Sequence, residues 1–251
     1  MRIVNVFHRI LSRSGELSFD KEVDLCPSSE PYPAHIMMAV NMSGPVSGKS
    51  FIDVGCWTGG LLRALSQEGA GSLVGVDIAG PWLSHAIKSV PEATFYEISS
   101  ISEAPAHLDG LSDRVMFLET IEHLPRGTES QALERISMLL QPNGTLILST
   151  PAAGIAQLLD PAWYLVGHRH YRFRRLSELL DHAEMEIIDV RYWGGFRTMI
   201  NIILMYFWKH ILRRRYEPAG WMNRRFDSSL SIRRNLFSTN IWVFARRKCA
   251  V

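Results

Sequence analysis

The sequence predicts a single α/β domain built on a doubly wound, mostly parallel, seven-stranded sheet. From residue 51 onward, apolar runs of strand length alternate with amphipathic helical runs, as they do in successive βαβ units. The first apolar run ends in the Gly-rich segment GCWTGG and leads directly into a helical pattern. The chain has 251 residues, of which 47% are hydrophobic, and this is enough for one large domain with a packed core.

Each element is predicted from its own pattern of residues. Short apolar runs predict strands near 51–54, 73–77, 93–97, 113–118, 144–150, 186–192 and 240–246. Apolar residues at helical spacing predict helices near 60–68, 82–89, 128–140 and 174–183, and a shorter helix near 35–42. The pair Asn143-Gly144 predicts a turn into the strand TLILST.

Two segments fall outside this alternation. Residues 1–50 are expected to form an N-terminal amphipathic helix and an arm, ahead of a main domain that covers 51–251. The helix is predicted from apolar residues at helical spacing, namely Ile3, Val4, Phe7, Ile10 and Leu11. A long insertion, 194–239, separates the last two predicted strands.

Charge is distributed unevenly along the chain. Residues 191–251 contain 13 Lys and Arg but only 2 Asp and Glu, although the whole chain has a net charge of +2. This excess favours an anionic partner: a membrane surface, a nucleic acid or an acidic substrate. A solvated basic face explains the same numbers without a partner.

The insertion begins with an apolar run, Met199 to Trp208, and continues into Arg213–Arg215. The run is too short to cross a bilayer, but it could lie in the interface with the arginines on anionic lipid. A buried helix that packs on the sheet explains the apolar part equally well. A nucleic-acid surface is less expected, because the aromatic residues here sit among aliphatic rather than basic neighbours.

Cysteine spacing and the N-terminus indicate the compartment. Cys26, Cys56 and Cys249 are far apart and show neither disulfide nor metal spacing. The first residues lack the long apolar core of a secretory signal, and no run reaches the length of a membrane span. A reducing, cytoplasmic location follows, and the basic insertion adds a peripheral position at the inner face of the membrane.

The glycine pattern after the first strand limits the kind of ligand. Gly55 and Gly60 flank Trp57 in a G-x-W-x-x-G pattern. A dinucleotide fingerprint needs glycine in the middle position, because the pyrophosphate lies against the backbone there. The loop is therefore either a structural turn or a site for a ligand without a pyrophosphate.

Five segments follow one another along the chain: FIDVGCWTGG, LVGVDIA, VMFLETIEHL, LLQPNGTLILSTP and HYRFRRLSELLDHAEMEI. In this order they resemble the motifs of class I S-adenosylmethionine-dependent methyltransferases, and VMFLETIEHL resembles the ubiquinone-biosynthesis O-methyltransferases in particular. The resemblance covers about 51–192 together with the last strand. It implies S-adenosyl-L-methionine as cofactor, and that molecule has no pyrophosphate.

The resemblance also implies roles for individual residues in binding the cofactor. Gly55 and Gly59 would form the tight turn, Asp53 would bind the amino group, and Asp77 would accept both ribose hydroxyls. Ser99 takes the place of the family's acidic contact to adenine, with Glu97 as the alternative. The remaining cofactor-binding residues would be Cys56, Trp57, Ile78 and Glu119.

Two histidines are the candidate catalytic residues. His123 follows the fourth strand and would act as general base, while His170 matches a family histidine that faces the acceptor. Structural roles for both histidines remain open. Glu119, Glu122 and His123 also reproduce an E-x-x-E-H set that could hold Mg²⁺, but the interpretation we favour has no metal.

The predicted function is methylation, most simply of a hydroxyl, on a lipid-linked or small-molecule acceptor at a membrane surface. An RNA methyltransferase and a non-catalytic binding protein with the same fold are the alternatives.

Overall fold

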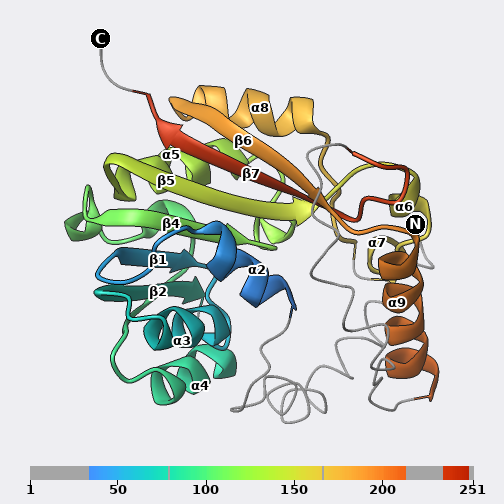
Figure 1. Ribbon diagram of the computed structural model, residues 1–251, viewed down its shortest axis with the longest axis horizontal. Helices are drawn as coiled ribbons and strands as arrows, with labels where there is room; N and C mark the ends of the chain where they lie inside the picture. Colours follow the sequence, from blue (N-terminus) through green and yellow to red (C-terminus); the bar gives the residue numbers. More distant parts are fainter. Residues whose placement is uncertain (1–33, 79, 166, 213–233, 249–251) are drawn as a thin grey trace.

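The computed structural model describes residues 34–78, 80–165, 167–212 and 234–248. Within these residues a seven-stranded sheet has the order β3-β2-β1-β4-β5-β7-β6 (Figure 1). The strands are β1 (Ser50–Val54), β2 (Ser72–Ile78), β3 (Thr94–Ile98), β4 (Ser112–Leu118), β5 (Leu140–Pro151), β6 (Met185–Trp193) and β7 (Asn240–Arg247). The predicted doubly wound sheet is therefore confirmed, with strand positions close to those expected.

The direction of β7 is the feature that the pattern did not predict. Strands β1 to β5 pair in parallel, whereas β7 runs antiparallel to both of its neighbours, β5 and β6. β7 lies between these two strands, so the strand made last among the described residues is an inner one. Asn143 has the left-handed φ of 66° that suits the predicted turn, but Leu140 already pairs with Ser112, and β5 begins there.

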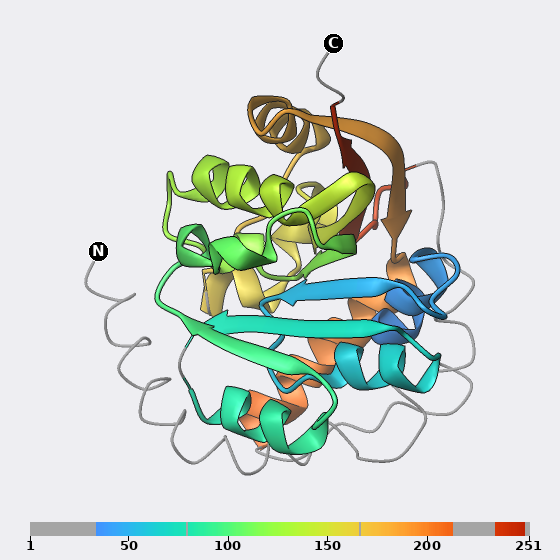
Figure 2. The ribbon, with the colours of Figure 1, turned by 90° about the vertical axis from the view of Figure 1, so that its left-hand side faces the viewer.

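Helices cover both faces of the sheet (Figure 2). One buried cluster joins one face to α5 and α8, and a second joins the other face to α2, α3 and α4. The bounds of the longer helices are α2 (Ala34–Met42), α3 (Gly60–Gln67), α4 (Pro81–Ser89), α5 (Glu129–Leu139) and α8 (Phe173–His182). Three short 3₁₀ turns complete this part: η1 (Ile101–Glu103), η2 (Ala106–Leu108) and η3 (Ile121–His123).

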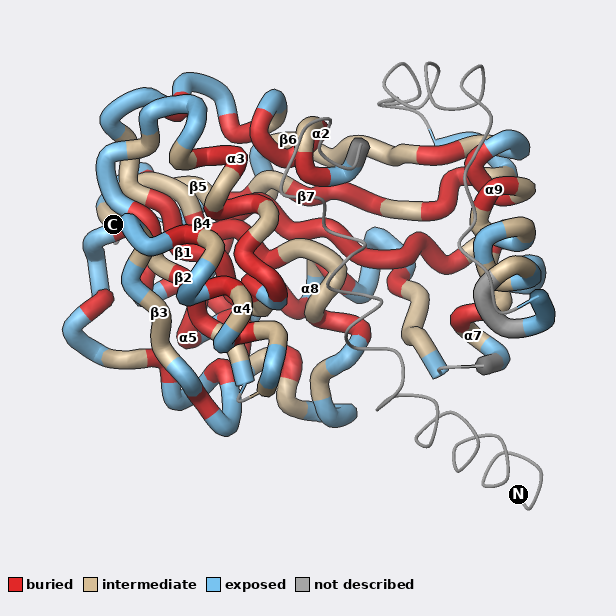
Figure 3. The backbone as a smooth tube through the Cα atoms, turned by 90° about the horizontal axis from the view of Figure 1, so that it is seen from below, coloured by how far each residue is buried: buried red, intermediate tan, exposed pale blue. Residues whose placement is uncertain are grey.

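The sequence pattern explains this arrangement. In β1 and β4, successive residues, which face opposite sides of the sheet, are buried, and this is why these strands are apolar runs (Figure 3). In α3 the apolar residues Leu61, Leu62 and Leu65 are buried, while Arg63 lies off that face. The helix starts directly after Gly59, which has a left-handed φ of 74°.

A group of helices lies beyond the carboxyl end of β5 (Figure 1). It comprises α6 (Ile155–Leu158), α7 (Pro161–Leu165) and α9 (Phe196–Phe207), and α9 continues into the π-helical turn η4 (Trp208–Leu212). α9 belongs to the predicted insertion and packs against α7. No helix of the described residues is long and apolar enough to cross a bilayer. The predicted N-terminal amphipathic helix and Arg213–Arg215 lie outside the described residues.

α9 is neither a fully buried helix nor a fully exposed one. Its buried residues are Thr198, Met199 and Asn201, two of which are polar. Phe196, Ile203 and Phe207 are exposed, and their spacing places them on one stripe of the helix. The core-helix interpretation therefore holds for one side of α9, and the other side presents apolar side chains outward.

Candidate active site

The loops after β1 and β4 meet where the strand order reverses. β1 pairs with β2 on one side and with β4 on the other, so the chain crosses from one half of the sheet to the other between β3 and β4. Ligands of open α/β sheets bind at the carboxyl ends of the strands at this switch point. The predicted cofactor residues lie there.

Gly55 makes the close approach of the two loops possible. Its φ is 83°, and a side-chain Cβ at this position would collide with the side chain of Thr120, which follows β4. The Gly55 N–H donates to the carbonyl of Val76 at 2.7 Å, which ties the loop to β2. A larger residue at this position would require the Thr120 side chain to move and would also strain the left-handed backbone.

Asp77 organises the same loop from the end of β2. Its carboxylate accepts the backbone N–H of Trp57 at 2.6 Å and that of Ile78 at 2.7 Å. The Trp57 backbone has a left-handed φ of 45°, and the indole is 44% exposed. The contribution of Trp57 to the loop is thus its backbone N–H, and its side chain turns outward.

Asp53 is the buried acid of the loop. Burial, together with the nearby Asp77 carboxylate, raises the pKa of Asp53 to about 8. Burial also raises the pKa of Asp77, against the opposing effect of its two backbone hydrogen bonds. Two acids at one loop, each destabilised in the charged form, are suited to a cationic or hydroxyl-rich ligand.

The remaining predicted cofactor residues take different positions. Cys56 is buried, and its sulfur lies close to where a side chain on Gly75 would project. Burial is the main reason that the pKa of this thiol is raised. Ile78 pairs with Ile98 in the β2–β3 ladder, so Ser99, the next residue of the chain, lies close to Ile78. Ile78 and Ser99 are both exposed. They form an accessible edge beside Asp77.

Glu119 and Glu122 point to separate partners. Glu119, with a left-handed φ of 49°, accepts hydrogen bonds from Ser149 at 2.6 Å and from Asn240 Nδ2 at 2.9 Å. Glu122 is buried and accepts from Thr150 at 3.0 Å. Burial raises the pKa of both carboxyl groups. Among the residues that the structure describes, no three His, Cys, Asp or Glu side chains are grouped as a metal site requires.

Arg169 holds the segment after β4 and was not recognised from the sequence. Its guanidinium donates to the backbone carbonyls of Ile121, Glu122 and Leu124 and forms an ion pair with Glu129. It lies between two histidines in the segment HRHY, and that context was the one available signal. The arginine therefore sets the position of η3, which carries His123.

His170 forms a buried pair with Asp160. Its Nε2 lies 3.0 Å from Asp160 Oδ2, its side chain is only 3% exposed, and its Nδ1 has no hydrogen-bond partner. Both residues line a cavity of about 170 Å³. Glu119, His168, Asn240 and apolar side chains of α6, α7 and α9 line the rest. The acid–histidine pair thus borders a small space whose walls combine polar side chains with apolar side chains of α6, α7 and α9.

His123 lies outside that cavity's lining. Its ring stands edge-on to His168, with 4.5 Å between ring centroids. Burial of the ring, with His168 and Arg169 nearby, lowers the pKa of His123 to about 4. The imidazole is therefore neutral at neutral pH, and as a base it is weaker than an ordinary histidine.

Comparisons with known proteins agree with this geometry. A family model described as a methyltransferase domain matches residues 41–189. The chain is 26% identical over 201 residues to the ubiquinone biosynthesis O-methyltransferase of Leptothrix cholodnii, which covers 74% of this chain and 84% of that protein.

Solved structures of similar fold include two methyltransferases. A TehB-like SAM-dependent methyltransferase from Corynebacterium glutamicum has a TM-score of 0.59 at 14% identity, over 94% of this chain and 100% of that one. The magnesium protoporphyrin IX methyltransferase of Synechocystis, crystallised with SAH, has a TM-score of 0.55 at 17% identity, over 86% and 84% of the two chains. At these identities the likeness concerns the fold.

Proposed function

Since the chain belongs to the methyltransferase domain family and is an S-adenosylmethionine-dependent methyltransferase, we propose that it methylates a hydroxyl on an apolar, lipid-linked acceptor. The observation that carries this proposal is the cavity where His170 and Asp160 meet the apolar walls of α6, α7 and α9. A volume of about 170 Å³ suits the reacting ring or sugar carbon of an acceptor rather than a whole lipid.

The residues at the switch point fit the cofactor. When bound, S-adenosylmethionine supplies a methyl group already activated on a sulfonium. The close approach at Gly55 and the buried Asp53 carboxyl are the features that suit this ligand. We assign Asp53 to the ammonium group, Asp77 to the ribose hydroxyls, and Ile78 with Ser99 to the adenine.

The pair of Asp160 and His170 is the proton acceptor in this proposal. When the Nε2–H group of His170 donates its hydrogen bond to Asp160, the Nδ1 atom carries a free lone pair. Nδ1 has no hydrogen-bond partner among the described residues. In this role Nδ1 would take the proton of the acceptor hydroxyl, which would prepare its oxygen to receive the methyl group that the sulfonium of the cofactor would release. Asp160 would stabilise the resulting imidazolium. Glu119 and Asn240, at the same cavity, would orient the acceptor.

The test compares three histidine variants and Asp160→Asn. His170→Gln and Asp160→Asn should lower kcat by roughly 10²–10⁴ with cofactor affinity unchanged within twofold. His182→Gln, an exposed histidine at the end of α8, is the matched control. Acceptors would be catechols with and without a prenyl chain, assayed with labelled S-adenosylmethionine. Full activity of His170→Gln, together with loss of activity in His123→Ala, would transfer the base role to His123.

The exposed stripe of α9 supports a position at the membrane. Ile203 and Phe207 face outward beside the acceptor cavity, while Met199, Ile202 and Met205 line it. An apolar stripe next to the cavity would let a lipid-linked acceptor reach the site without leaving the interface. Arg213–Arg215, which follow in the sequence, would add attraction to anionic lipid.

Vesicle binding tests the membrane part separately. Ile203→Ser with Phe207→Ser should weaken binding to vesicles at least fivefold without lowering Tm, because both side chains are exposed. Leu111→Ser, an exposed apolar residue at the amino end of β4, is the control. Replacing Arg213–Arg215 by glutamine should flatten the salt dependence of binding. If the unaltered protein binds no vesicles, this part of the proposal is wrong.

A further inference from the structure

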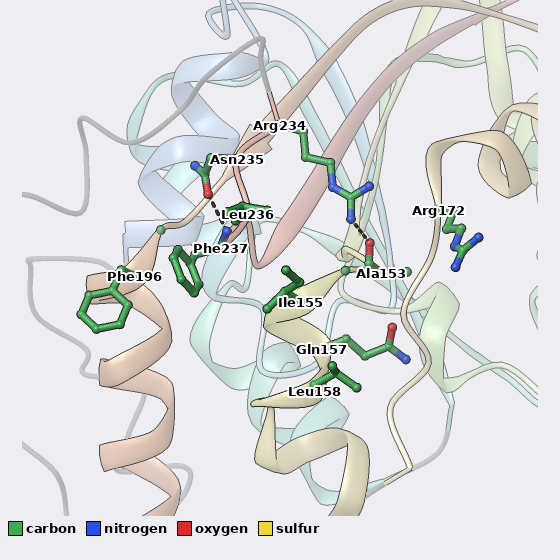
Figure 4. A pocket seen from close by; sticks show the side chains of 12 residues that line it. Ala153, Ile155, Gln157, Leu158, Arg172, Phe196, Arg234, Asn235, Leu236 and Phe237 are labelled. Atoms are coloured by element: carbon green, nitrogen blue, oxygen red, sulfur yellow. Dashed lines mark hydrogen bonds between the residues drawn. The ribbon is translucent and has the colours of Figure 1, made fainter.

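A second hollow lies on the other side of α6 from the acceptor cavity. It is an open groove of about 1230 Å³ between α6, the start of α9 and residues 234–237 (Figure 4). Ile155 and Leu158 of α6 line the groove, whereas Ala156 and Leu159 line the acceptor cavity. The two spaces therefore share one short helix as a wall, and the groove is several times the larger.

The groove has apolar and cationic parts. The apolar part consists of Ile155, Leu158, Leu236 and the edge-packed rings of Phe196 and Phe237, whose centroids are 5.3 Å apart. The cationic part consists of Arg172 and Arg234. In the view of Figure 4 the two guanidinium groups lie on one side of the groove and the two phenylalanine rings on the other.

In the part of the chain that the structure describes, neither arginine is neutralised by an acid. Among the described residues, the lining contains no Asp or Glu, and neither guanidinium forms an ion pair. Arg234 donates to the carbonyl of Ala153, which leaves most of its donors free for another acceptor. Arg172 is exposed and precedes α8. Two unpaired guanidinium groups beside an apolar wall attract an anion that carries a hydrocarbon part.

We propose that this groove binds a lipid phosphate: an aliphatic or prenyl chain against Ile155, Leu158 and Phe196, with the phosphate between Arg172 and Arg234. The assignment goes beyond the proposed function, because it requires neither methyl transfer nor a bilayer. Gly154 is part of the arrangement, since a Cβ there would collide with the Arg234 guanidinium. Its φ of 174° is ordinary extended backbone, so alanine would displace the guanidinium without straining the chain.

The experiment is calorimetric titration of the full chain with monomeric farnesyl phosphate, below its micelle concentration. Farnesol has the hydrocarbon tail without the charge, and inorganic phosphate has the charge without the hydrocarbon tail. We expect farnesol to bind at least tenfold more weakly than farnesyl phosphate, and inorganic phosphate to show no binding at 1 mM.

Variants locate the site. Arg172→Gln with Arg234→Gln should weaken farnesyl phosphate binding at least tenfold, and Gly154→Ala should weaken it several-fold with Tm unchanged. Leu158→Ser with Phe196→Ser should also weaken farnesyl phosphate binding, since the farnesyl tail then loses two of its apolar contacts. Arg174→Gln, an exposed arginine of α8 outside the groove, is the control.

Three results would overturn the proposal. They are equal affinity for farnesol and farnesyl phosphate, affinity that survives the arginine and Gly154 variants alike, and binding of anionic vesicles with none of the monomer. Failure of methyl transfer would leave the titration unaffected, so the two proposals fail separately.

Discussion

At the scale of single residues, the switch-point loop depends on groups that are costly to keep in the fold. Asp53 has a pKa of about 8 in the folded protein, against 3.8 as the ordinary value. Between these two pH values the folded state holds a proton that the unfolded state has released. The contribution of Asp53 to stability is therefore full below about pH 4, and it is lost as the pH rises through about 8.

The first prediction follows from this fall in stability with rising pH. Asp53→Asn should flatten the fall of Tm between pH 5 and pH 8, because asparagine has no proton to release. The measurement is Tm by calorimetry across this pH range, with Asp181→Asn, a surface carboxylate, as control. Equal pH dependence in the protein and in Asp53→Asn would contradict the raised pKa.

Gly55 supports a second prediction. Gly55→Ala should lower the free energy of unfolding by about 2 kcal/mol or more, because it combines a left-handed backbone with a collision at Thr120. Urea denaturation measures this change. Adding Thr120→Ala should recover the part due to the collision and leave the backbone part. Strict additivity of the two substitutions would show that the loops do not touch there.

Single residues also show which parts of the candidate site could be predicted from the sequence. Gly55 and Gly59 have left-handed φ values of 83° and 74°, as the predicted tight turn requires, because a turn depends on residues close in sequence. Arg169 was not found, because its partners are carbonyls about 45 residues away, and no pattern of side chains marks a carbonyl. The partner of His170 was also missed, since Asp160 lies in a stretch without strand or helix periodicity.

At the scale of elements, the segment after β4 is held by one side chain. We expect Arg169→Ala to lower the free energy of unfolding by about 3 kcal/mol, because Glu129 loses its ion pair and three backbone carbonyls each lose a hydrogen bond. Arg169→Lys should restore only part of this, since an ammonium cannot reach four acceptors in a plane. Chemical denaturation checks both values, and Arg174→Ala, a surface ion pair, should change little.

Strand positions were predicted well because a buried parallel strand is a continuous apolar run bounded by turns. Strand direction was not predicted, because the same apolar run can pair in a parallel or an antiparallel direction. β7 reads in sequence like any other inner strand, and its reversal follows from where the insertion returns the chain. The sequence alone could not predict that one stripe of α9 is exposed, because composition does not show which side of a helix packs against the sheet.

At the scale of the whole molecule, the cofactor should stabilise the fold by mass action. A ligand present at one hundred times its Kd adds about 2.7 kcal/mol to stability. S-adenosylmethionine should therefore raise Tm, and Asp77→Ala should reduce this rise by lowering affinity at least tenfold. Because Asp77 also holds the Trp57 backbone, the variant should lose stability without ligand as well. A ligand-induced rise in Tm that is unchanged in Asp77→Ala would remove Asp77 from the site.

The position of β7 has a consequence for how the chain matures during synthesis. A ribosome releases residues 240–247 after β5 and β6, yet these residues must enter between them. Until then two strands present open edges, and each is a template for pairing with another chain. Closing contacts between strands about 95 residues apart is slow, because a long loop must first be ordered. The nascent protein is therefore most exposed to aggregation in the interval before its inner strand arrives, and chaperones that shield strand edges would act there.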